Sequence, residues 1–377
     1  MQDLFDQING RPEGHGLPPR CYTDEHFLHL EIEKLLRSEW HCIGREDEVP
    51  QVGDYFTMDL LSEPLLVVRK TETEIAVLSN VCRHRGMLVA SGEGNTKRFR
   101  CPYHAWTYEL DGKLRNAPLV PKAQLVKDCG LPVLNSRCWQ GFIFVSLAED
   151  AVWPGDEAIV DEGGVNSLSQ LGLHIENYHM ESMHHAAHFH EVWDCNWKSL
   201  IENFMDGYHL SVVHPETLHH LTPTSLCKKV PGTASFTAYT ANYASTAPER
   251  VNHHASLSAE QARQSQLFCI FPAMIASLSA DTLVYLALHP LNATQVAVKW
   301  GISTFEDDLS KEEVQSRIDK WQKINHEDHE ILKHLQKGLQ SSRCHTGPLA
   351  EDNFEGTLYD FHSYLINKLE IPSVRGT

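Results

Sequence analysis

Two short motifs in the first third of the chain each combine a cysteine with a histidine. Cys82 and His84 form C-x-H, Cys101 and His104 form C-x-x-H, and sixteen residues separate the two pairs. The segment between them is polar and contains three glycines, so it is able to fold back and bring the pairs together. Thiolate and imidazole groups are common ligands of zinc and iron. The spacing therefore indicates a metal site.

The distribution of the ligands bears on which metal is bound. A structural zinc ion is often held by two cysteines and two histidines, but zinc spacings usually keep the cysteines as one pair and the histidines as another. Here each arm supplies one of each. Two cysteines on one iron and two histidines on the other is the ligand set of a Rieske [2Fe–2S] cluster. We favour the cluster, with Cys82, His84, Cys101 and His104 as its ligands, over zinc.

A second candidate site lies in the latter half of the chain. His209 and His214 are five residues apart, Asp206 precedes the first by three, and a proline follows the second. Two histidines with one carboxylate form the facial triad of non-haem Fe(II), which leaves open positions for O₂. A spacing of five is not ideal for one helical face, so a bend near Val213 would be needed to turn both rings inward.

The elements that must position these residues differ between the two halves. Residues 23–40 have a helical pattern that begins with a Thr and an Asp, both suited to capping a helix. Residues 41–148 then contain short segments rich in β-branched and aromatic residues, which predict a small all-β domain. The strands expected there cover residues 54–60, 63–70, 74–81 and 141–147.

The remainder of the chain mixes both types. We expect one helix that continues to about Val213 and stops at Pro215, and a long helix over residues 310–341 that begins at Ser310 with Glu313 three residues on. Strands are expected at residues 234–244, 267–279, 282–291 and 294–303. This predicts an α+β fold in which residues 1–40 and 149–377 form a second domain with an antiparallel sheet and covering helices.

Composition limits the classes of function. The chain has 377 residues, 42% of them hydrophobic and 22% charged, which suits about two globular domains. A net charge of −18 argues against nucleic-acid binding. No apolar run predicts a membrane span, and the polar, acidic N-terminus lacks the pattern of a signal peptide, so we expect a cytoplasmic protein. Ten scattered cysteines favour metal ligands over a disulfide framework.

Both motifs resemble those of one family. C-R-H-R-G followed by C-P-Y-H-A-W resembles the cluster loops of Rieske non-haem iron oxygenases, and N-W-K-S-L-I-E-N-F-M-D-G-Y-H-L-S-V-V-H-P resembles their mononuclear iron segment. The resemblance covers most of the chain and is nearer to the homotrimeric alkylammonium and demethylase members than to the large aromatic-ring dioxygenases. It implies an oxygenase alpha subunit whose catalytic domain has a curved antiparallel sheet of the helix-grip type.

The resemblance also implies a third ligand of the mononuclear iron. The family's carboxylate comes from a helix near the C-terminus, and N-H-E-D-H-E-I-L-K-H-L-Q-K-G-L-Q-S resembles that helix, which implies Asp328 beside His209 and His214. Glu327 and Glu330 are local competitors. Weaker candidates lie in a later acidic stretch, at Glu351, Asp352 and Glu355.

Two further residues of the iron segment take roles from the resemblance. It implies catalytic roles for Asn203 and Asp206. In the family the acidic residue at the position of Asp206 bridges a histidine of the mononuclear site and a cluster histidine of the neighbouring subunit. Carried over, this would join His209 to His104 across a subunit contact, most simply in a homotrimer. We also place Asp206 on the same helical side as His209.

The function that follows is that of the terminal oxygenase in a multicomponent system. Electrons from NAD(P)H would come through a separate reductase, because the chain has no G-x-G-x-x-G signature between a strand and a helix. The expected reaction is monooxygenation or oxidative demethylation of a small organic substrate, with a quaternary or N-methylated amine as the candidate. Aromatic residues of one expected strand, Phe236, Tyr239 and Tyr243, are candidates to supply ring faces for such a cation, and the alternative is that they belong to the core of the sheet. The alternatives are an aromatic-ring hydroxylating dioxygenase and a Rieske electron-transfer protein without catalysis.

Overall fold

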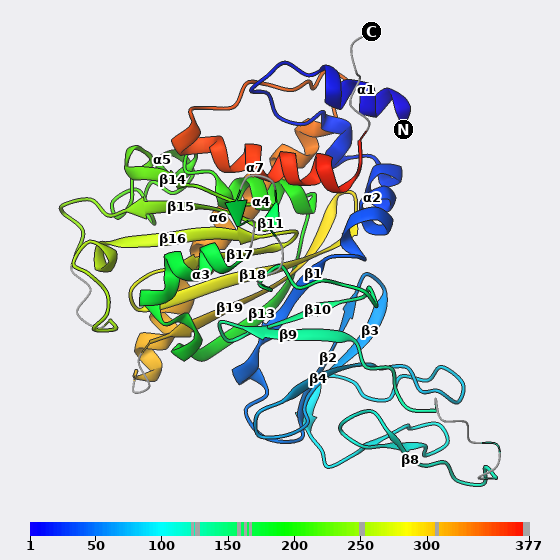
Figure 1. The fold of residues 1–377 in the computed structure, drawn as a ribbon. Helices are drawn as coiled ribbons and strands as arrows, with labels where there is room; N and C mark the ends of the chain where they lie inside the picture. The colour runs from blue at the N-terminus through cyan, green and yellow to red at the C-terminus, as the bar shows by residue number, and fades with distance from the viewer. Residues whose placement is uncertain are drawn as a thin grey trace. The chain divides into compact units, whose positions relative to one another are not determined.

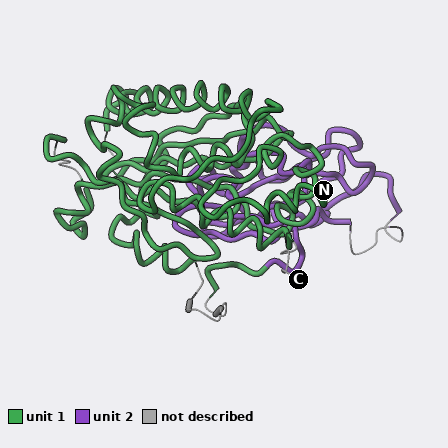
Figure 2. The backbone as a smooth tube through the Cα atoms, turned by 90° about the horizontal axis from the view of Figure 1, so that it is seen from above, with its two compact units in different colours: residues 1–41, 152–377 green, residues 42–151 purple. Residues whose placement is uncertain are grey.

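The chain divides into two compact units in the computed structural model, which describes residues 1–121, 124, 129–156, 160–161, 164–165, 168–248, 253–305 and 309–371 (Figures 1 and 2). Unit 1 comprises residues 1–41 and 152–377, and unit 2 comprises residues 42–151. None of the ten cysteines, all of which lie in the described residues, forms a disulfide. In the described part of the chain no helix is both long enough and apolar enough to cross a membrane.

Unit 2 is built from short antiparallel strands in three small sheets. Their orders are β4-β3-β2-β5, β1-β10-β9 and β6-β7-β8. The strands are β1 (Trp40–Arg45), β2 (Asp54–Leu60), β3 (Glu63–Arg69), β4 (Ile75–Ser79), β5 (Glu93–Asn95), β6 (Phe99–Arg100), β7 (Thr107–Tyr108), β8 (Leu114–Asn116), β9 (Asn135–Trp139) and β10 (Phe142–Ser146). The expectation of a small all-β domain in this region is confirmed.

Strand β3 serves two hydrophobic cores at once, because successive side chains on a strand point to opposite faces. Leu65 and Val67 pack into a core with β1 and β10, whereas Leu66 and Val68 pack into a second core. The second core contains the two cysteines of the Cys/His arms, together with Phe99, Trp106 and Tyr108. The arms are therefore anchored on one face of the four-stranded sheet.

Unit 1 is organised around a seven-stranded antiparallel sheet of order β13-β19-β18-β17-β16-β15-β14. Six consecutive strands run as a meander, and β13 pairs with the last of them at the edge (Figure 1). The strands are β13 (His184–Trp193), β14 (Cys227–Val230), β15 (Phe236–Asn242), β16 (Gln264–Ile270), β17 (Met274–Leu278), β18 (Thr282–Asn292) and β19 (Gln295–Thr304).

Three helices pack on this sheet. Helix α4 (Trp197–Met205) contacts β16, β17 and β18, helix α6 (Lys311–Leu339) contacts β13, and helix α7 (Asp352–Lys368) contacts β14 and β15. Both α6 and α7 also contact α4 (Figure 1). The remaining elements are α1 (Gln2–Gly10), η1 (Pro19–Tyr22), α2 (Glu25–Glu31), η2 (Ile32–Leu36), η3 (Glu46–Glu48), β11 (Val160–Asp161), β12 (Gly164–Val165), α3 (Ser169–Ile175), η5 (Glu176–Tyr178), η6 (Met180–Ser182), α5 (Leu210–Val213), η7 (Thr224–Leu226) and η8 (Gln261–Arg263).

Local capping signals place two helix starts as the sequence predicts. Asp24 caps α2 by accepting from the His26 N–H, and Ser310 caps α6 in a reciprocal capping box with Glu313. The helix predicted over residues 23–40 is shorter than expected. Helix α2 passes into the π-helical turn η2, and β1 begins at Trp40.

The prediction of one helix up to Val213 is wrong. Helix α4 ends at Met205, Asp206 adopts an extended conformation, and the short helix α5 follows. The break is set by contacts from other elements. The Gly207 N–H donates to the Phe354 carbonyl at 2.9 Å, and a Cβ at Gly207 would come within 2.8 Å of Cys227. Only glycine fits this approach.

Segment 267–279 was expected to form one strand but forms two. β16 ends at Ile270 and β17 begins at Met274, with Pro272 in the turn between them. Proline has no N–H for a ladder hydrogen bond, so it falls outside the paired strands. The sequence patterns did not identify β13, which is an edge strand of the large sheet, or α7, which is the last helix that covers it.

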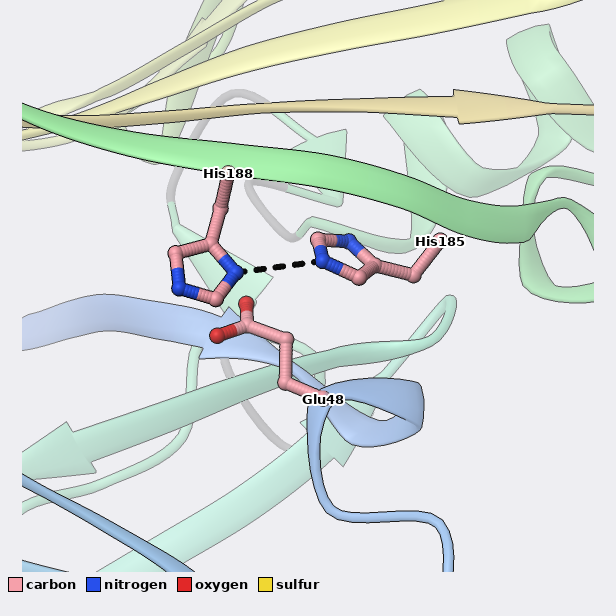
Figure 3. Close-up of side chains that lie close together, drawn as sticks. All are labelled: Glu48, His185 and His188. Carbon is pink, nitrogen blue, oxygen red and sulfur yellow. Dashed lines mark hydrogen bonds between the residues drawn. The ribbon is translucent and has the colours of Figure 1, made fainter. Parts of the chain in front are cut away.

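Strand β13 carries a bulge that places two histidines on one face. Residues three apart on a regular strand point to opposite faces. The register shift between His185 and Ala187 inserts one extra residue into β13, so that the alternation of side chains between the two faces is interrupted there. His185 Nε2 and His188 Nδ1 consequently lie 3.1 Å apart and share a hydrogen bond (Figure 3). One ring must donate and the other must accept, so this contact requires at least one neutral imidazole.

The N-terminal segment is attached to unit 1 by a buried ion pair. Glu31, at the end of α2, lies 2.7 Å from the Lys198 ammonium on α4, and both side chains are fully buried. Trp197 Nε1 also donates to Glu31. Nearby, the Tyr22 hydroxyl donates to Glu202 at 2.6 Å. These contacts explain why residues 1–41 group with the C-terminal part of the chain rather than with unit 2.

We predict that Lys198→Met destabilises unit 1 by about 3–5 kcal/mol, because it leaves the Glu31 carboxylate buried without its cation. The measurement is denaturant unfolding followed by tryptophan fluorescence. The double variant Glu31→Gln/Lys198→Met removes both charges, so it should recover much of the loss. A single variant as stable as the parent would show that the pair does not hold the N-terminal segment.

Candidate metal centres

The two Cys/His arms of unit 2 fold into the same turn twice. In the first arm the Cys82 N–H donates to the carbonyl five residues on at 2.8 Å, and the Gly86 N–H donates to the Cys82 carbonyl at 3.0 Å. The second arm repeats both bonds at the same spacing and the same lengths from Cys101. The residue four places after each cysteine has a positive φ, 77° at Gly86 and 60° at Ala105. The arms are therefore equivalent, as a two-arm ligand set requires.

Within the arms, sulfur lies inside and nitrogen lies outside. Cys82 and Cys101 are buried, whereas His84 and His104 are exposed with ring centroids 4.7 Å apart. The two thiols are close enough to interact with each other. Two cysteines together and two histidines together fit the Rieske cluster, in which each pair serves its own iron. The arrangement fits zinc less well, because a single ion would need all four donors around one point.

Two neighbours of the arms were not singled out from the sequence. The Tyr108 hydroxyl lies 3.2 Å from Cys82 Sγ and accepts from the Arg83 N–H. Trp106 stacks on His84 at 5.0 Å with an interplanar angle of 10°. Hydrogen bonds to the ligating sulfur and fixed ring orientation both tune a metal site. In the sequence, the only indication of these roles is that Trp106 and Tyr108 follow His104 by two and four residues.

In unit 1, three residues predicted as iron ligands come together. One ligand atom from each of His209, His214 and Asp328 lies within 4.8 Å of the others. Asp328 Oδ1 is 3.0 Å from His214 Nε2 and 3.7 Å from His209 Nε2. His209 and His214 flank the four residues of α5, and Asp328 lies on α6. Two imidazoles and one carboxylate are the donor set of mononuclear non-haem iron, so these residues fit the metal.

Both histidines are held through their second ring nitrogen. Asp206 Oδ1 lies 2.7 Å from His209 Nδ1 and accepts from the His209 N–H at 2.9 Å. Glu327 Oε2 lies 2.8 Å from His214 Nδ1. A carboxylate on Nδ1 fixes the ring and leaves Nε2 for a metal. Asp206 reaches His209 through the non-helical turn after α4, so its predicted place on the same helical side is wrong.

The carboxylates also set the charge of the metal-free site. Burial by itself would lower the pKa of His209, but Asp206 and Asp328 outweigh it and raise that pKa to about 9. The pKa of His214 is also raised, because Asp328 and Glu327 outweigh its burial. The carboxylates therefore favour the protonated form of both rings, and a metal that binds competes with protons for the ring nitrogens.

Some of the other sequence-predicted residues contact the three converging residues, and the rest lie outside that group. Asn203 Nδ2 donates to Asp328 Oδ1 at 3.0 Å and lies 3.4 Å from His209 Nε2, which puts its amide at the site. Glu327 is close to the site, but it contacts the far side of His214 rather than the common point. Outside the three-residue group lie the remaining candidates Glu330, Glu351, Asp352 and Glu355.

A cavity opens beside the three converging residues. It has a volume of about 100 Å³, and its wall is mainly apolar and aromatic. Phe204, Tyr239, Tyr243 and Trp321 contribute rings to it. Of the three aromatic residues proposed from the sequence to face a cation, Tyr239 and Tyr243 line this cavity, whereas Phe236 does not.

Two protein families match the chain. Residues 180–371 match the ring hydroxylating alpha subunit (catalytic domain) family, and residues 39–133 match the Rieske [2Fe-2S] domain family. The chain therefore belongs to the ring-hydroxylating alpha subunits, which are Rieske non-haem iron oxygenases. Their cofactors are a Rieske [2Fe–2S] cluster and a mononuclear iron, and both donor sets described above fit these groups.

Individual relatives span more than one kind of oxygenase. The chain is 34% identical over 218 residues to the glycine betaine monooxygenase oxygenase subunit of Pseudomonas aeruginosa (strain UCBPP-PA14), covering 57% of this chain and 48% of that protein. It is 33% identical over 223 residues to the chlorobenzene dioxygenase subunit alpha of Cupriavidus sp. (strain PS12), covering 55% and 45%. The match therefore spans about half the length of these relatives.

Among solved structures, the quaternary ammonium Rieske monooxygenase CntA in complex with an inhibitor has the same fold. The TM-score is 0.81 at 19% sequence identity, over 98% of each chain. This likeness confirms the α+β fold class and the combination of an all-β Rieske domain with an antiparallel catalytic sheet covered by helices.

We predict that Asp328→Ala keeps the cluster but empties the mononuclear site and stops turnover. Two neutral imidazoles without an anionic ligand hold Fe(II) weakly. Iron analysis should fall from about three to about two atoms per chain, with the cluster's visible absorption unchanged.

Glu330→Ala is the matched control, because it removes a half-exposed carboxylate two residues along the same helix. It should keep all the iron. If Asp328→Ala retains the mononuclear iron and Glu327→Ala loses it, the third ligand is Glu327.

Proposed function

We propose that the protein is the terminal oxygenase of a multicomponent Rieske system, which uses O₂ and electrons from NAD(P)H to oxidise a small organic substrate. The observation that carries the proposal is the convergence of His209, His214 and Asp328 on the wall of a largely apolar cavity. We further propose that unit 2 is the Rieske domain and unit 1 the catalytic domain, with bounds near the predicted residues 41–148 and 1–40 with 149–377.

The roles of the residues follow from their contacts. Cys82, His84, Cys101 and His104 would hold the cluster, and His209, His214 and Asp328 would hold the mononuclear iron. When bound, these groups supply single-electron transfer and the activation of O₂. Asp206 and Glu327 hold the two imidazoles through Nδ1, and the Asn203 amide holds Asp328 by a hydrogen bond. The apolar wall of the cavity excludes water from the reacting group.

We propose a quaternary or N-methylated amine as the substrate, oxidised by monooxygenation or oxidative demethylation. The aromatic faces of Tyr239, Tyr243 and Trp321 on the cavity wall suit an alkylammonium group. The glycine betaine relative and the quaternary ammonium monooxygenase of the same fold support this class.

Two alternatives make different predictions. An aromatic-ring dioxygenase is supported by the chlorobenzene relative and by the apolar lining of the cavity. It would convert a one-ring arene to a dihydrodiol and release no formaldehyde. An electron-transfer protein would hold about two iron atoms per chain rather than three. The intact set of His209, His214 and Asp328 argues against the carrier.

The partners are part of the proposal. A separate reductase would deliver the electrons, either directly or through a ferredoxin. We also propose a homotrimer in which Asp206 of one subunit joins its own His209 to the cluster ligand His104 of the next. The contact of Asp206 with His209 supports one half of that bridge. The expected cytoplasmic location stays a prediction of the sequence.

The function is tested with a substrate panel. The purified oxygenase, a Rieske reductase and NADH are supplied with trimethylated amines, N-methylated amines and one-ring arenes. O₂ uptake matched by product is measured, with formaldehyde as the product of demethylation. We expect coupled turnover with an amine. Coupled turnover with an arene alone would establish the dioxygenase, and a lack of coupled turnover with any member would favour the carrier.

We predict that Asp206→Asn leaves both iron sites occupied and the cluster reducible but lowers product formation by more than about 100-fold. Loss of a carboxylate that orients a ligating histidine commonly costs about 10–100-fold, and here the electron route to the mononuclear site would be lost as well.

The matched control is Asp352→Asn, which makes the same change at an exposed carboxylate and should keep normal turnover. Stopped-flow reduction of the cluster separates the cluster itself from the step that follows it. Near-normal turnover in Asp206→Asn, or full activity in a monomer, would refute the route between subunits.

A further inference from the structure

Strand β13 carries three histidines on one face of the large sheet, outside both centres described above. The bulge places His185 and His188 on the same face, and His190 follows His188 by two residues, which keeps it on that face. The rings of His185 and His188 reach toward one another from the strand (Figure 3). The ring centroid of His190 lies 5.6 Å from that of His188. The strand therefore presents a group of imidazole nitrogens that neither iron centre uses.

The separation of the two facing nitrogens suits a single metal ion. Zinc binds imidazole nitrogen at about 2.0–2.1 Å, so two nitrogens on one ion lie about 2.9–3.4 Å apart for angles of about 90–110° at the metal. The 3.1 Å between His185 Nε2 and His188 Nδ1 falls inside this range. Their ring centroids are 5.2 Å apart, close to the 5.3 Å between His209 and His214 of the mononuclear site. The pair on β13 is therefore spaced like a pair of metal-ligating histidines.

The protonation of the pair is compatible with metal binding. The hydrogen bond between His185 and His188 requires at least one neutral imidazole. A neutral imidazole carries a single N–H, so each ring can hold its proton on the outer nitrogen while the two facing nitrogens bind one ion. When both rings are neutral, binding needs a tautomer shift in the donor ring and releases no proton. The pair then exchanges one hydrogen bond for two metal–nitrogen bonds.

The neighbouring strand β19 leaves the two rings without an opposing cation on that strand. Ser303 lies opposite His185 and Gly301 lies opposite His188, and neither residue carries a charge. Lys299 lies opposite the third histidine, and side chains that are directly opposite on a sheet have Cβ atoms about 4.5–5.5 Å apart. A lysine cation disfavours a metal ion beside it. The third histidine is therefore the weakest donor of the three.

We propose that His185 and His188 form a further metal site of unit 1, which binds a divalent transition-metal ion of the Zn²⁺ type with water at the remaining positions. Neutral imidazoles suit Zn²⁺, Cu²⁺ and Ni²⁺, whereas Ca²⁺ and Mg²⁺ require oxygen ligands. Because β13 is an edge strand, the ion ties together the residues on either side of its bulge. This inference does not depend on the proposed oxygenase function.

The test is zinc binding to the iron-loaded protein. The protein is equilibrated with Zn²⁺ by dialysis, and zinc and iron are both measured by mass spectrometry. We expect about one zinc ion per chain in addition to the iron. X-ray absorption at the zinc edge should show nitrogen and oxygen ligands without sulfur, which excludes zinc that has replaced iron at the cysteines of the cluster. The midpoint of thermal unfolding should rise with Zn²⁺, because a ligand that binds the folded state stabilises it.

The variants assign the zinc to β13. His185→Gln and His188→Gln should each weaken zinc binding by about 100-fold or more, since loss of a residue that only orients a ligand already costs about 10–100-fold. His190→Gln should have a smaller effect. His184→Gln is the matched control, because it removes an exposed histidine from the opposite face of the same strand and should keep the zinc. Asp328→Ala, which removes a ligand of the mononuclear site alone, should also keep it.

Three results would overturn the site. The first is a parent protein that takes up no zinc beyond its iron, and the second is equal zinc binding by the parent, His185→Gln and His188→Gln. The third is a sulfur ligand at the zinc edge, which would place the zinc in the cluster arms. An unchanged iron content and circular dichroism spectrum show that each variant is folded. If one of the two glutamine variants does not fold, the other carries the test.

Discussion

The geometry of the mononuclear site depends on the interruption between α4 and α5. Helix α7 holds the chain open there, since the Thr357 hydroxyl donates to the Met205 carbonyl at 2.6 Å and the Phe354 carbonyl accepts from the Gly207 N–H. With the helix broken, Asp206 turns back onto His209. A continuous helix would place two histidines five residues apart on different faces. The interruption is what allows both rings to face Asp328.

Charged side chains are distributed unevenly along the wall of the cavity. Three carboxylates, Asp206, Glu327 and Asp328, surround two imidazoles at one end, where they favour positive charge on the rings or a metal in its place. At the other end lie Arg317, which forms an ion pair with Asp281, and Lys320. Between them the wall is mainly apolar and aromatic, so these charges are less screened than they would be in bulk water.

The two candidate centres are built in different ways. The cluster arms are two copies of one local turn, with the same two backbone hydrogen bonds and a positive φ at the same position. Such a turn is determined mostly by residues within six positions of each other. The iron ligands instead come from α5 and α6, more than a hundred residues apart in the chain, and the groups that orient them come from the turn after α4 and from α6.

This difference explains which features could be predicted from the sequence and which could not. The types and order of the cluster residues, the capping box at Ser310 and the strands β2–β4, β10, β15, β18 and β19 could be predicted, because each depends on neighbours in the chain. The break after Met205, the position of Glu327 behind His214 and the strand β13 were not readable. Their energies come from contacts such as Gly207 with Phe354 and His214 with Glu327. No local pattern encodes such contacts, because they form only when segments that are distant in the chain pack together.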